Sequence, residues 1–397
     1  MRAIQSTTGV SDSKARGLHK LRASVAGVLG ALTLAVTIGA VQAADFKLSN
    51  EAGVTAGLGL RTSFTSTEQG AGNGIDDSKN FAAESTRLFF SGHYGKVIKG
   101  TLNFEKTGAG GNTDNILDAY VGFEFSDYFN IWFGHFLPPN DRGNGYGPYY
   151  ATPWDFPLLV SRYPNIQNGR DEGVAFWGKL LNNKLVWAGG IFEGNRGGPG
   201  TATFATNELA FSGRLAYHIW DPEPAPAYLS GGWYGGSKDI LTVGLGAFTQ
   251  KDGVGLVGAS SDLDIWNLDV LFEKKFSMGV PTLEGAYYEY KSGASDAVII
   301  PGKAYLVGAA FLFPAKVGWG QFQPFYRYQS LKPDSSVLPG TPEMKKQDFG
   351  VNYIIKGPNA KISFQYSKAE NYNYGFAGPS APGTERDQFV IGAQLIY

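Results

Sequence analysis

The sequence from residue 53 to residue 64 reads Gly-Val-Thr-Ala-Gly-Leu-Gly-Leu-Arg-Thr-Ser-Phe. Apart from Thr62, its even-numbered positions are apolar, and its odd-numbered positions hold glycine, threonine, arginine or serine. Successive side chains of a β-strand point to opposite faces of the sheet. The pattern therefore predicts a strand with one apolar face and one polar face, and Arg61 lies on the polar face.

The same alternation recurs at residues 98–105, 117–124, 266–273, 348–355 and 361–366. In all six segments the apolar face holds no lysine, arginine, aspartate or glutamate. A face that contacts lipid has to be free of charge, because a basic residue at the bilayer midplane costs about 2–4 kcal/mol. A soluble β-sandwich also alternates, so the connections between the segments have to separate the two folds.

The connections alternate between short and long. Short ones lie near residues 94–97, 126–128, 181–184, 274–279, 314–318 and 357–359, and long polar ones lie near 66–83, 107–113, 137–169, 195–207, 251–262, 291–302, 330–345 and 369–386. Short periplasmic turns and longer extracellular loops are typical of bacterial outer-membrane barrels, which have an even number of strands. We therefore expect an all-β fold, a transmembrane antiparallel β-barrel of about sixteen strands formed by residues 44–397 in the bacterial outer membrane.

One connection, residues 221–238, is long where the alternation calls for a short turn. It contains three prolines and the aromatic residues Tyr228, Trp233 and Tyr234. Two interpretations are open: it docks a periplasmic partner, or it is a connector that packs under the barrel.

Both ends of the chain agree with export to the outer membrane. Residues 1–22 are polar and basic, and residues 23–43 carry no charge and end in Val41-Gln42-Ala43. This predicts a secretory signal peptide, residues 1–43, cleaved before Ala44, with an uncleaved transmembrane helix as the alternative. At the other end, residues 388–397 alternate and finish on Tyr397. That ending resembles the terminal strand that the barrel-assembly machinery is thought to read.

Composition excludes several classes of protein. Charged residues make up only 17% of the chain and aromatic residues 14%, and there is no cysteine. The absence of cysteine excludes disulfides and cysteine-ligated metal sites, and we expect no cofactor. Residues 44–397 hold 29 basic and 34 acidic residues. This net acidic balance argues against a nucleic-acid partner, which would require a basic patch.

Several motifs resemble those of the phosphate- and polyphosphate-selective porin family. They are Leu117-Asp118-Ala119-Tyr120-Val121, Phe133-Gly134-His135-Phe136 followed by Pro138-Pro139, and Gly169-Arg170-Asp171-Glu172-Gly173-Val174, with further similarity at 211–215, 239–241 and 323–328. The resemblance is diffuse but spans most of residues 44–397. It implies a sixteen-stranded barrel, a homotrimer and a third loop folded inward as a constriction.

Residues 137–169, the longest connection, support an inward loop independently. The segment contains six prolines and the aromatic residues Tyr146, Tyr149, Tyr150, Trp154 and Phe156. Prolines stiffen a loop and remove backbone donors, and so many aromatic side chains require burial. An external lid or a subunit contact is the alternative.

Pore selectivity depends on the charges and the width at the narrowest ring. The candidates on the expected lumen face and on the long loop are Arg61, Arg87, Glu105, Asp118, Asp141, Arg142, Arg162, Arg170, Asp171, Arg214, Asp269 and Arg327. Both signs are present, which favours a water-filled channel for passive diffusion of small hydrophilic solutes and ions. Phosphate-selective relatives are richer in basic residues than this chain, and a channel selective for inorganic anions is the alternative.

Two other classes of function are weaker. An outer-membrane hydrolase could use Ser91 with His93, or Ser212 with His218, but no Gly-x-Ser-x-Gly motif accompanies either pair, so we expect no enzyme. A non-conducting structural barrel is the other alternative, and a conductance measurement separates it from a channel.

Overall fold

The computed structural model describes residues 43–107, 114–162, 169–195, 208–256, 258–296, 299–374 and 378–397. The expected signal peptide falls on residues outside this part of the chain, except for Ala43. Among the described residues, no helix is long and apolar enough to cross a membrane.

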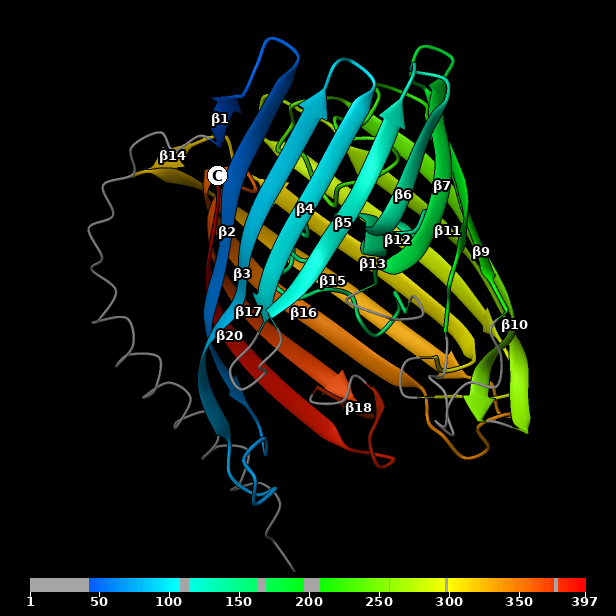
Figure 1. The fold of residues 1–397 in the computed structure, drawn as a ribbon. Coiled ribbons are helices and arrows are strands. Elements are labelled where there is room, and N and C mark those ends of the chain that lie inside the picture. The colour runs from blue at the N-terminus through cyan, green and yellow to red at the C-terminus, as the bar shows by residue number, and fades with distance from the viewer. Residues whose placement is uncertain are drawn as a thin grey trace, which may run out of the picture. The chain divides into compact units, whose positions relative to one another are not determined.

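Sixteen antiparallel strands of the described chain form a closed ring (Figure 1). In ring order they are β2 (Ala52–Thr67), β3 (Ser78–Tyr94), β4 (Ile98–Thr107), β5 (Asp114–Glu124), β6 (Asn130–Phe136), β7 (Asp171–Leu180), β8 (Leu185–Phe192), β9 (Ala210–His218), β10 (Ile240–Leu256), β11 (Ala259–Glu273), β12 (Val280–Lys291), β13 (Gly302–Leu312), β15 (Gly320–Pro333), β16 (Met344–Lys356), β17 (Ala360–Glu370) and β20 (Glu385–Ile396). Each strand pairs with the next along the chain, and the expected all-β barrel is confirmed.

The last strand closes the ring against the first. In this register Phe64 of β2 lies opposite Ile391 of β20. The backbone of Tyr397 donates a hydrogen bond to the carbonyl of Leu58 at 2.9 Å. Closure leaves no open sheet edge, as lipid surroundings require. Four short strands lie beside the ring: β1 (Ala44–Lys47) against β2, β14 (Lys316–Val317) against β15, and the pair β18 (Tyr372–Asn373) and β19 (Gly378–Pro379).

The alternation expected from the sequence separates two environments. On β11, Leu268 is 46% exposed on the outer face, whereas Asn267 and Asp269 are 1% and 2% exposed inside. Aromatic residues form contacts near both rims, with Trp266, Tyr287 and Tyr305 toward the long loops and Phe322 and Tyr353 toward the short turns. An apolar band between two aromatic girdles is the outer surface of a transmembrane barrel.

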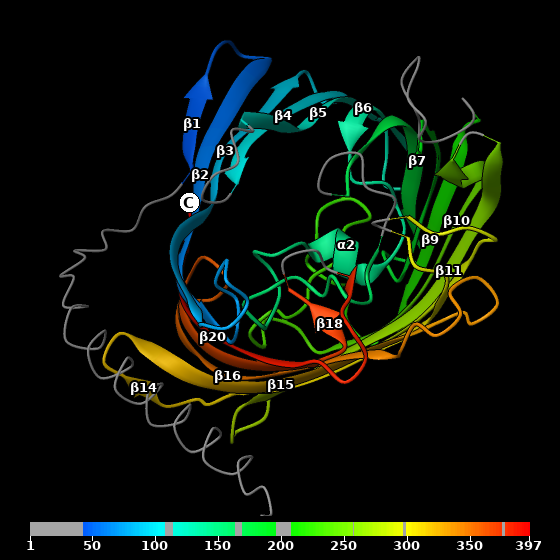
Figure 2. The same ribbon diagram turned by 90° about the horizontal axis from the view of Figure 1, so that it is seen from below.

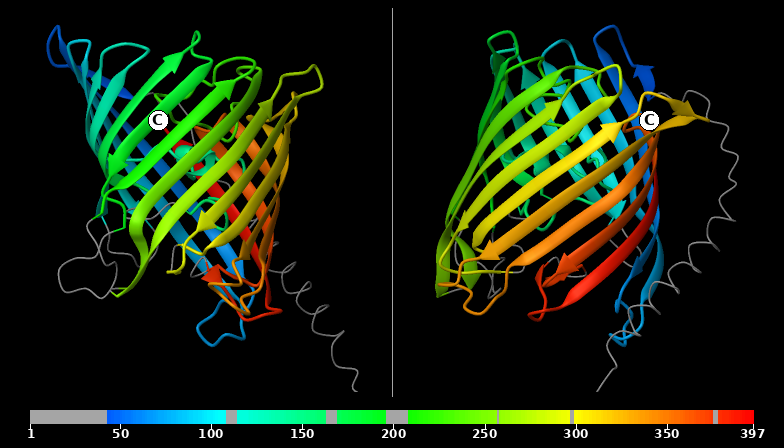
Figure 3. Two further views of the ribbon diagram at one scale, coloured as in Figure 1. Left: turned by 90° about the vertical axis from the view of Figure 1, so that its right-hand side faces the viewer. Right: turned by 180° about the vertical axis from the view of Figure 1, so that it is seen from behind.

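The short turns gather at one end of the ring, here called the turn end, at the top of Figure 1, and most long connections lie at the other, the loop end (Figures 1 and 3). One expected loop is wrong. Residues 251–262 are mostly strand, because β10 and β11 stay paired out to Leu256 and Ala259 across an irregularity after Gln250. Glycine and charge suggested a loop there, but hydrogen bonding to the partner strand outweighs that local preference.

The largest apolar cluster lies inside the barrel. It includes the lumen-facing residues Trp132, Trp177 and Phe192 on β6, β7 and β8, which pack with segments that fold into the lumen. A view along the barrel places α2 (Arg142–Tyr146) within the ring of strands (Figure 2). The lumen is therefore partly filled, and the filling determines where water can pass.

Candidate functional site

The long loop that follows β6, called the inward loop here and described for residues 137–162, folds into the lumen as expected. Asp141 caps α2 by accepting a hydrogen bond from the backbone of Asn144 at 2.9 Å. The same carboxylate accepts from the Ser161 hydroxyl at 2.8 Å, which joins the two arms of the loop. Tyr149 and Trp154, farther along the loop, are 1% and 2% exposed. The inward constriction is therefore confirmed.

The barrel wall holds this loop mainly by its backbone. Eight of its carbonyl groups accept hydrogen bonds from wall side chains on seven strands. The donor and acceptor pairs are Ser212 with Pro139, Arg214 with Asn140, Gln394 with Tyr149, Lys361 with Ala151, Asn352 with Thr152, Arg61 with Trp154, Arg327 with Asp155 and Tyr290 with Val160. Buried carbonyls need partners, and a proline-rich loop supplies few of its own.

Arg61 therefore lies beneath the loop. Besides its bond to the Trp154 carbonyl, its guanidinium lies 4.1 Å from the centre of the Trp154 ring. Its nearest carboxylate oxygen, on Glu84, is 3.8 Å away. Arg61 is 2% exposed, so its contacts are with the loop.

A second charged group surrounds Arg142. Its Nε donates to Asp269 at 2.9 Å, and Arg214 donates to the other oxygen of Asp269 at 2.6 Å. Its two terminal nitrogens donate to Glu223 at 3.0 and 2.8 Å. Burial alone would raise the pKa of Glu223, but the Arg142 charge and hydrogen bonds from Arg142 and Tyr234 lower it to about 2.

Glu223 belongs to the connection 221–238, which we call the inner turn. This segment lies inside the barrel, where Glu223, Tyr228 and Trp233 are 9%, 5% and 1% exposed. The interpretation that the segment is a connector under the barrel is wrong, because it packs inside. Docking of a periplasmic partner stays a prediction, and Tyr228 and Trp233 are buried in the lumen. Apolar lumen positions on β6 and β7 give Tyr228 a place to pack, and those on β12, β13 and β16 do the same for Trp233.

A third charged group holds the tip of the inward loop. Arg327 of β15 donates to Asp348 at 2.8 Å and to Asp155 of the loop at 3.0 Å. Lys346 of β16 also binds Asp155. Burial opposes ionisation of Asp155, but Lys346 and Arg327 hold its pKa well below the usual range.

The fourth group lies on the wall formed by β3, β4, β5 and the start of β7. Arg87 pairs with Glu105, with 2.6 Å between Nε and Oε1. Arg170 pairs with Asp118, with 3.1 Å between Nε and Oδ1. The ring of Tyr149, from the inward loop, lies 4.7 Å from the Arg87 guanidinium. Two cations and two anions thus stand side by side where the loop approaches this wall.

The remaining candidates hold loop ends. The backbone of Arg162 donates to the Tyr290 hydroxyl, and its Nε donates to the Leu159 carbonyl. Asp171, 0% exposed, accepts from the backbone of Gly194 and Glu172. The Arg162 contacts hold the inward loop against β12, and the Asp171 contacts hold the backbone after β8 at the start of β7.

Exposure of the lumen-facing residues is strongly asymmetric. On β15, β16 and β17, Gln323, Asn352 and Ser363 are all 0% exposed, because the inward loop covers them. On the opposite wall, Ser91 and His93 of β3 are exposed, and Lys99 and Thr101 of β4, Tyr120 and Glu124 of β5 are half-exposed. On the polar face Ser91 pairs with Thr101, His93 with Lys99, and Thr101 with Tyr120 across neighbouring strands. The solvated part of the lumen, called the open lane here, therefore runs along the turn-end halves of β3–β5 and narrows at Arg87, Glu105 and Asp118, which are 8%, 4% and 8% exposed.

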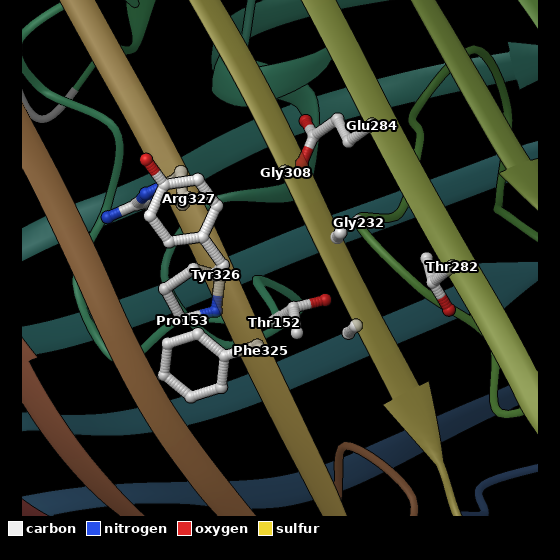
Figure 4. A pocket seen from close by; sticks show the side chains of 11 residues that line it. Thr152, Pro153, Gly232, Thr282, Glu284, Gly308, Phe325, Tyr326 and Arg327 are labelled. Atoms are coloured by element: carbon white, nitrogen blue, oxygen red, sulfur yellow. The ribbon is translucent and has the colours of Figure 1, made fainter.

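A small pocket remains on the covered side. It lies between the inward loop, the inner turn and β12–β15, and it is lined by Thr152, Gly232, Glu284 and Arg327 among others (Figure 4). It has room for about one water molecule.

Glu223, Lys346 and Glu84 take part in these groups but were not among the sequence candidates. Glu223 was missed because its segment was assigned to a connection outside the lumen. The prolines and three aromatic residues of that segment were the available signal, since aromatic side chains need burial. The serine and histidine of the Ser212–His218 pair have different partners. The Ser212 hydroxyl donates to the Pro139 carbonyl, and the His218 ring contacts the Thr242 hydroxyl.

A closed ring of sixteen antiparallel strands, an apolar outer band and a lumen narrowed by an inward loop define the outer-membrane porin fold. The chain has this fold.

Solved structures of the same class are similar to it. The outer-membrane protein OmpT of Vibrio cholerae is 14% identical, with a TM-score of 0.54 over 89% of this chain and 100% of that chain. An anion-selective porin from Comamonas acidovorans is 16% identical, with a TM-score of 0.56 over 87% and 100%. OmpF of Salmonella typhi is 12% identical, with a TM-score of 0.57 over 89% and 100%. No protein-family model and no curated protein sequence matches the chain.

Proposed function

We propose that this protein is a passive channel of the bacterial outer membrane through which small hydrophilic solutes and ions diffuse. The open lane along β3–β5 carries the proposal, because it is the solvated side of a lumen otherwise covered by the inward loop. The porin fold supports the same conclusion.

The Arg87–Glu105 and Asp118–Arg170 pairs, whose four residues are each 8% exposed or less, form the narrow part of the lane that solutes have to pass. Two positive and two negative groups give no net charge there, which favours weak ion selectivity. Selectivity for phosphate or other inorganic anions is the second candidate. It is supported by the motif resemblance and by the structural similarity to the Comamonas acidovorans protein, which is an anion-selective porin.

Planar-bilayer recording in a potassium chloride gradient tests the function. We expect discrete conductance steps and a small reversal potential. Arg87→Gln leaves Glu105 without its cation and shifts the reversal potential toward cation preference, and Glu105→Gln shifts it toward anions. Lys316→Gln, an equal charge change at an exposed turn residue, is the control and leaves the potential unchanged.

The outcomes separate the candidates. A strong anion preference with block by phosphate favours the anion-selective channel over the general one. An absence of steps from correctly folded protein contradicts both and leaves a structural barrel.

We also propose that the chain is exported and assembles as a homotrimer. The basic and then apolar segment before Ala44 supports removal of residues 1–43, which the mass of the purified protein tests. The alternating final strand supports insertion by the barrel-assembly machinery. One structure of Vibrio cholerae OmpT is a trimer form, which supports the oligomer. Light scattering in detergent measures the number of chains.

A further inference from the structure

The inner turn crosses the lumen from one wall to another. Near its middle, the Tyr228 ring lies 5.2 Å from the Trp132 ring of β6. Five residues later, Trp233 packs in a buried cluster with Val280, Leu312 and Ile354, on β12, β13 and β16. Aromatic anchors on two separate arcs of the wall fix a segment that would otherwise be free to leave the barrel.

Hydrogen bonds join the inner turn to the inward loop. The Tyr228 hydroxyl donates to the Leu137 carbonyl at 2.7 Å, and the backbone of Gly232 donates to the Tyr150 carbonyl at 3.1 Å. Arg142 adds a two-pronged ion pair with Glu223 and a bond to the Gly231 carbonyl at 2.9 Å. Paired contacts of an arginine fork with a carboxylate combine strength with a defined orientation.

The barrel wall also binds the backbone of the inner turn through β11. The carboxylate of Glu273, at the turn end of β11, accepts from the backbone of Tyr234 at 2.9 Å and of Gly236 at 2.7 Å. Glu273 is 0% exposed, although it is the last residue of its strand. A lumen-facing residue at a barrel rim is normally open to water. The burial of Glu273 therefore indicates that the inner turn covers it.

The two sides of the turn end differ for this reason. Ile354 of β16 and Thr282 of β12, near their turn-end termini, are each 4% exposed. Ser91 and His93 are exposed near the corresponding end of β3. The inward loop reaches part of this side, where the Thr152 carbonyl accepts a hydrogen bond from Asn352 of β16. Trp233 of the inner turn packs directly with Ile354 and Val280, and Thr282 donates at 2.9 Å to Glu273, which binds the backbone of the inner turn.

We propose that the inner turn is a second constriction element that closes the β9–β16 side of the lumen from the turn end. It confines solutes to the open lane, and Arg142 joins it to the inward loop to form one partition. This inference rests on the proposed channel function.

The inner turn can be deleted without changing the strands on either side of it. The backbone of Asp221 donates to the Asp239 carbonyl at 3.0 Å, so the β9–β10 ladder continues to this pair. Replacing residues 222–238 with Asn-Gly makes a two-residue hairpin turn, which suits antiparallel strands. We expect a roughly two-fold larger single-channel conductance, because the wider lumen opens beside the existing lane.

A milder variant covers the case in which the deletion does not fold. Trp233→Ala combined with Glu223→Ala removes one wall anchor and the ion pair while keeping the segment, and it should raise conductance or produce flicker between two levels. Lys238→Gln, at an exposed position of the same segment, is the control and should match the wild type. Folding of each variant is verified by heat-modifiable migration in gels.

Each result bears on the proposal separately from the channel function. If the wild type conducts and both folded variants conduct equally well, the inner turn is not a constriction and the channel function stands. If the wild type is silent and the deletion conducts, the inner turn is a complete plug, which supports the partition and contradicts an open wild-type lane. Silence from wild type and folded deletion alike overturns both.

Discussion

At position 142 a buried arginine makes four hydrogen bonds, to Asp269 of β11 and to Glu223 and Gly231 of the inner turn. Lysine has one ammonium group and no fork, so it cannot reproduce this geometry. Charged residues in the lumen were expected to face solutes. Arg142, Arg214 and Arg327 instead hold polypeptide in place. The charged side chains that are half-exposed on the lane are Lys99 and Glu124, whereas Arg87 and Arg170 are buried in ion pairs at its narrow end.

The Glu223 carboxylate leads to a pH prediction at this scale. Its pKa is lowered from 4.5 to about 2 in the folded protein, despite burial, by Arg142 and Tyr234. A lowered pKa means that the ion pair stabilises the fold fully above about pH 4.5, and that this contribution is lost as pH falls through about 2. The Arg142–Glu223 pair should therefore cause no change in wild-type conductance between pH 8 and 5. Conductance should rise toward pH 2, where Glu223 is protonated and the inner turn loosens.

Glu223→Gln is the matched variant. It is neutral at every pH, so its conductance at pH 7 should already resemble that of the wild type at low pH. Bilayer recording across pH in both proteins measures this. Identical pH profiles for the two would show that another group controls the response.

At the scale of elements, the inward loop is positioned by its carbonyl groups and by flat aromatic contacts with the wall. Gly392 of β20 allows one such contact, because a Cβ there would lie 2.6 Å from the Trp154 ring. The side-chain oxygen of Gln365 on β17 accepts a hydrogen bond from the backbone N–H of Trp154 at 2.8 Å. The loop therefore depends on the size of wall residues as much as on their charge.

Gly392→Val should push Trp154 from the wall and lower the free energy of unfolding by about 1–3 kcal/mol. It should also change the channel conductance, because the loop moves. Gly100→Val on β4 is the matched control, since a Cβ at Gly100 has no neighbour within 4 Å. Urea unfolding in detergent micelles compares the two, and equal losses would show that the Trp154 contact is unimportant.

At the scale of the whole molecule, the ring requires an outer face without charge. Leu268 lies on that face between the aromatic girdles and is 46% exposed. Leu268→Arg should reduce the free energy of folding into lipid vesicles by about 2–4 kcal/mol. Leu256→Arg, at the 55% exposed tip of β10, should cost much less. Equal costs would mean that Leu268 does not contact the apolar part of the bilayer.

Most strands could be predicted from the sequence because each carries its own alternation. The strand Gly53–Phe64 and the final strand ending at Tyr397 show it directly, and the structure pairs them. The connection 251–262 could not be predicted, since pairing with a partner strand overrides glycine and charge. The inner turn was recognised as unusual in length, but its destination depends on Trp132, Val280 and Ile354, which lie far from it in the sequence.

The sequence by itself determined that this chain forms a closed barrel with a lipid-facing surface, because lipid imposes a strict two-residue period on every strand that crosses it. It also favoured an inward fold for residues 137–169, because proline and aromatic residues require burial, and the structure confirms this for residues 137–162. Only the tertiary structure decided which lumen charges meet water. Arg61 and Arg87 look equivalent in the sequence and both are buried, yet Arg61 bonds to the Trp154 carbonyl of the inward loop, whereas Arg87 pairs with Glu105 of the wall. The inward loop and the inner turn likewise meet inside the ring through Arg142 and Glu223, which lie about eighty residues apart, and a local sequence pattern cannot show such a contact.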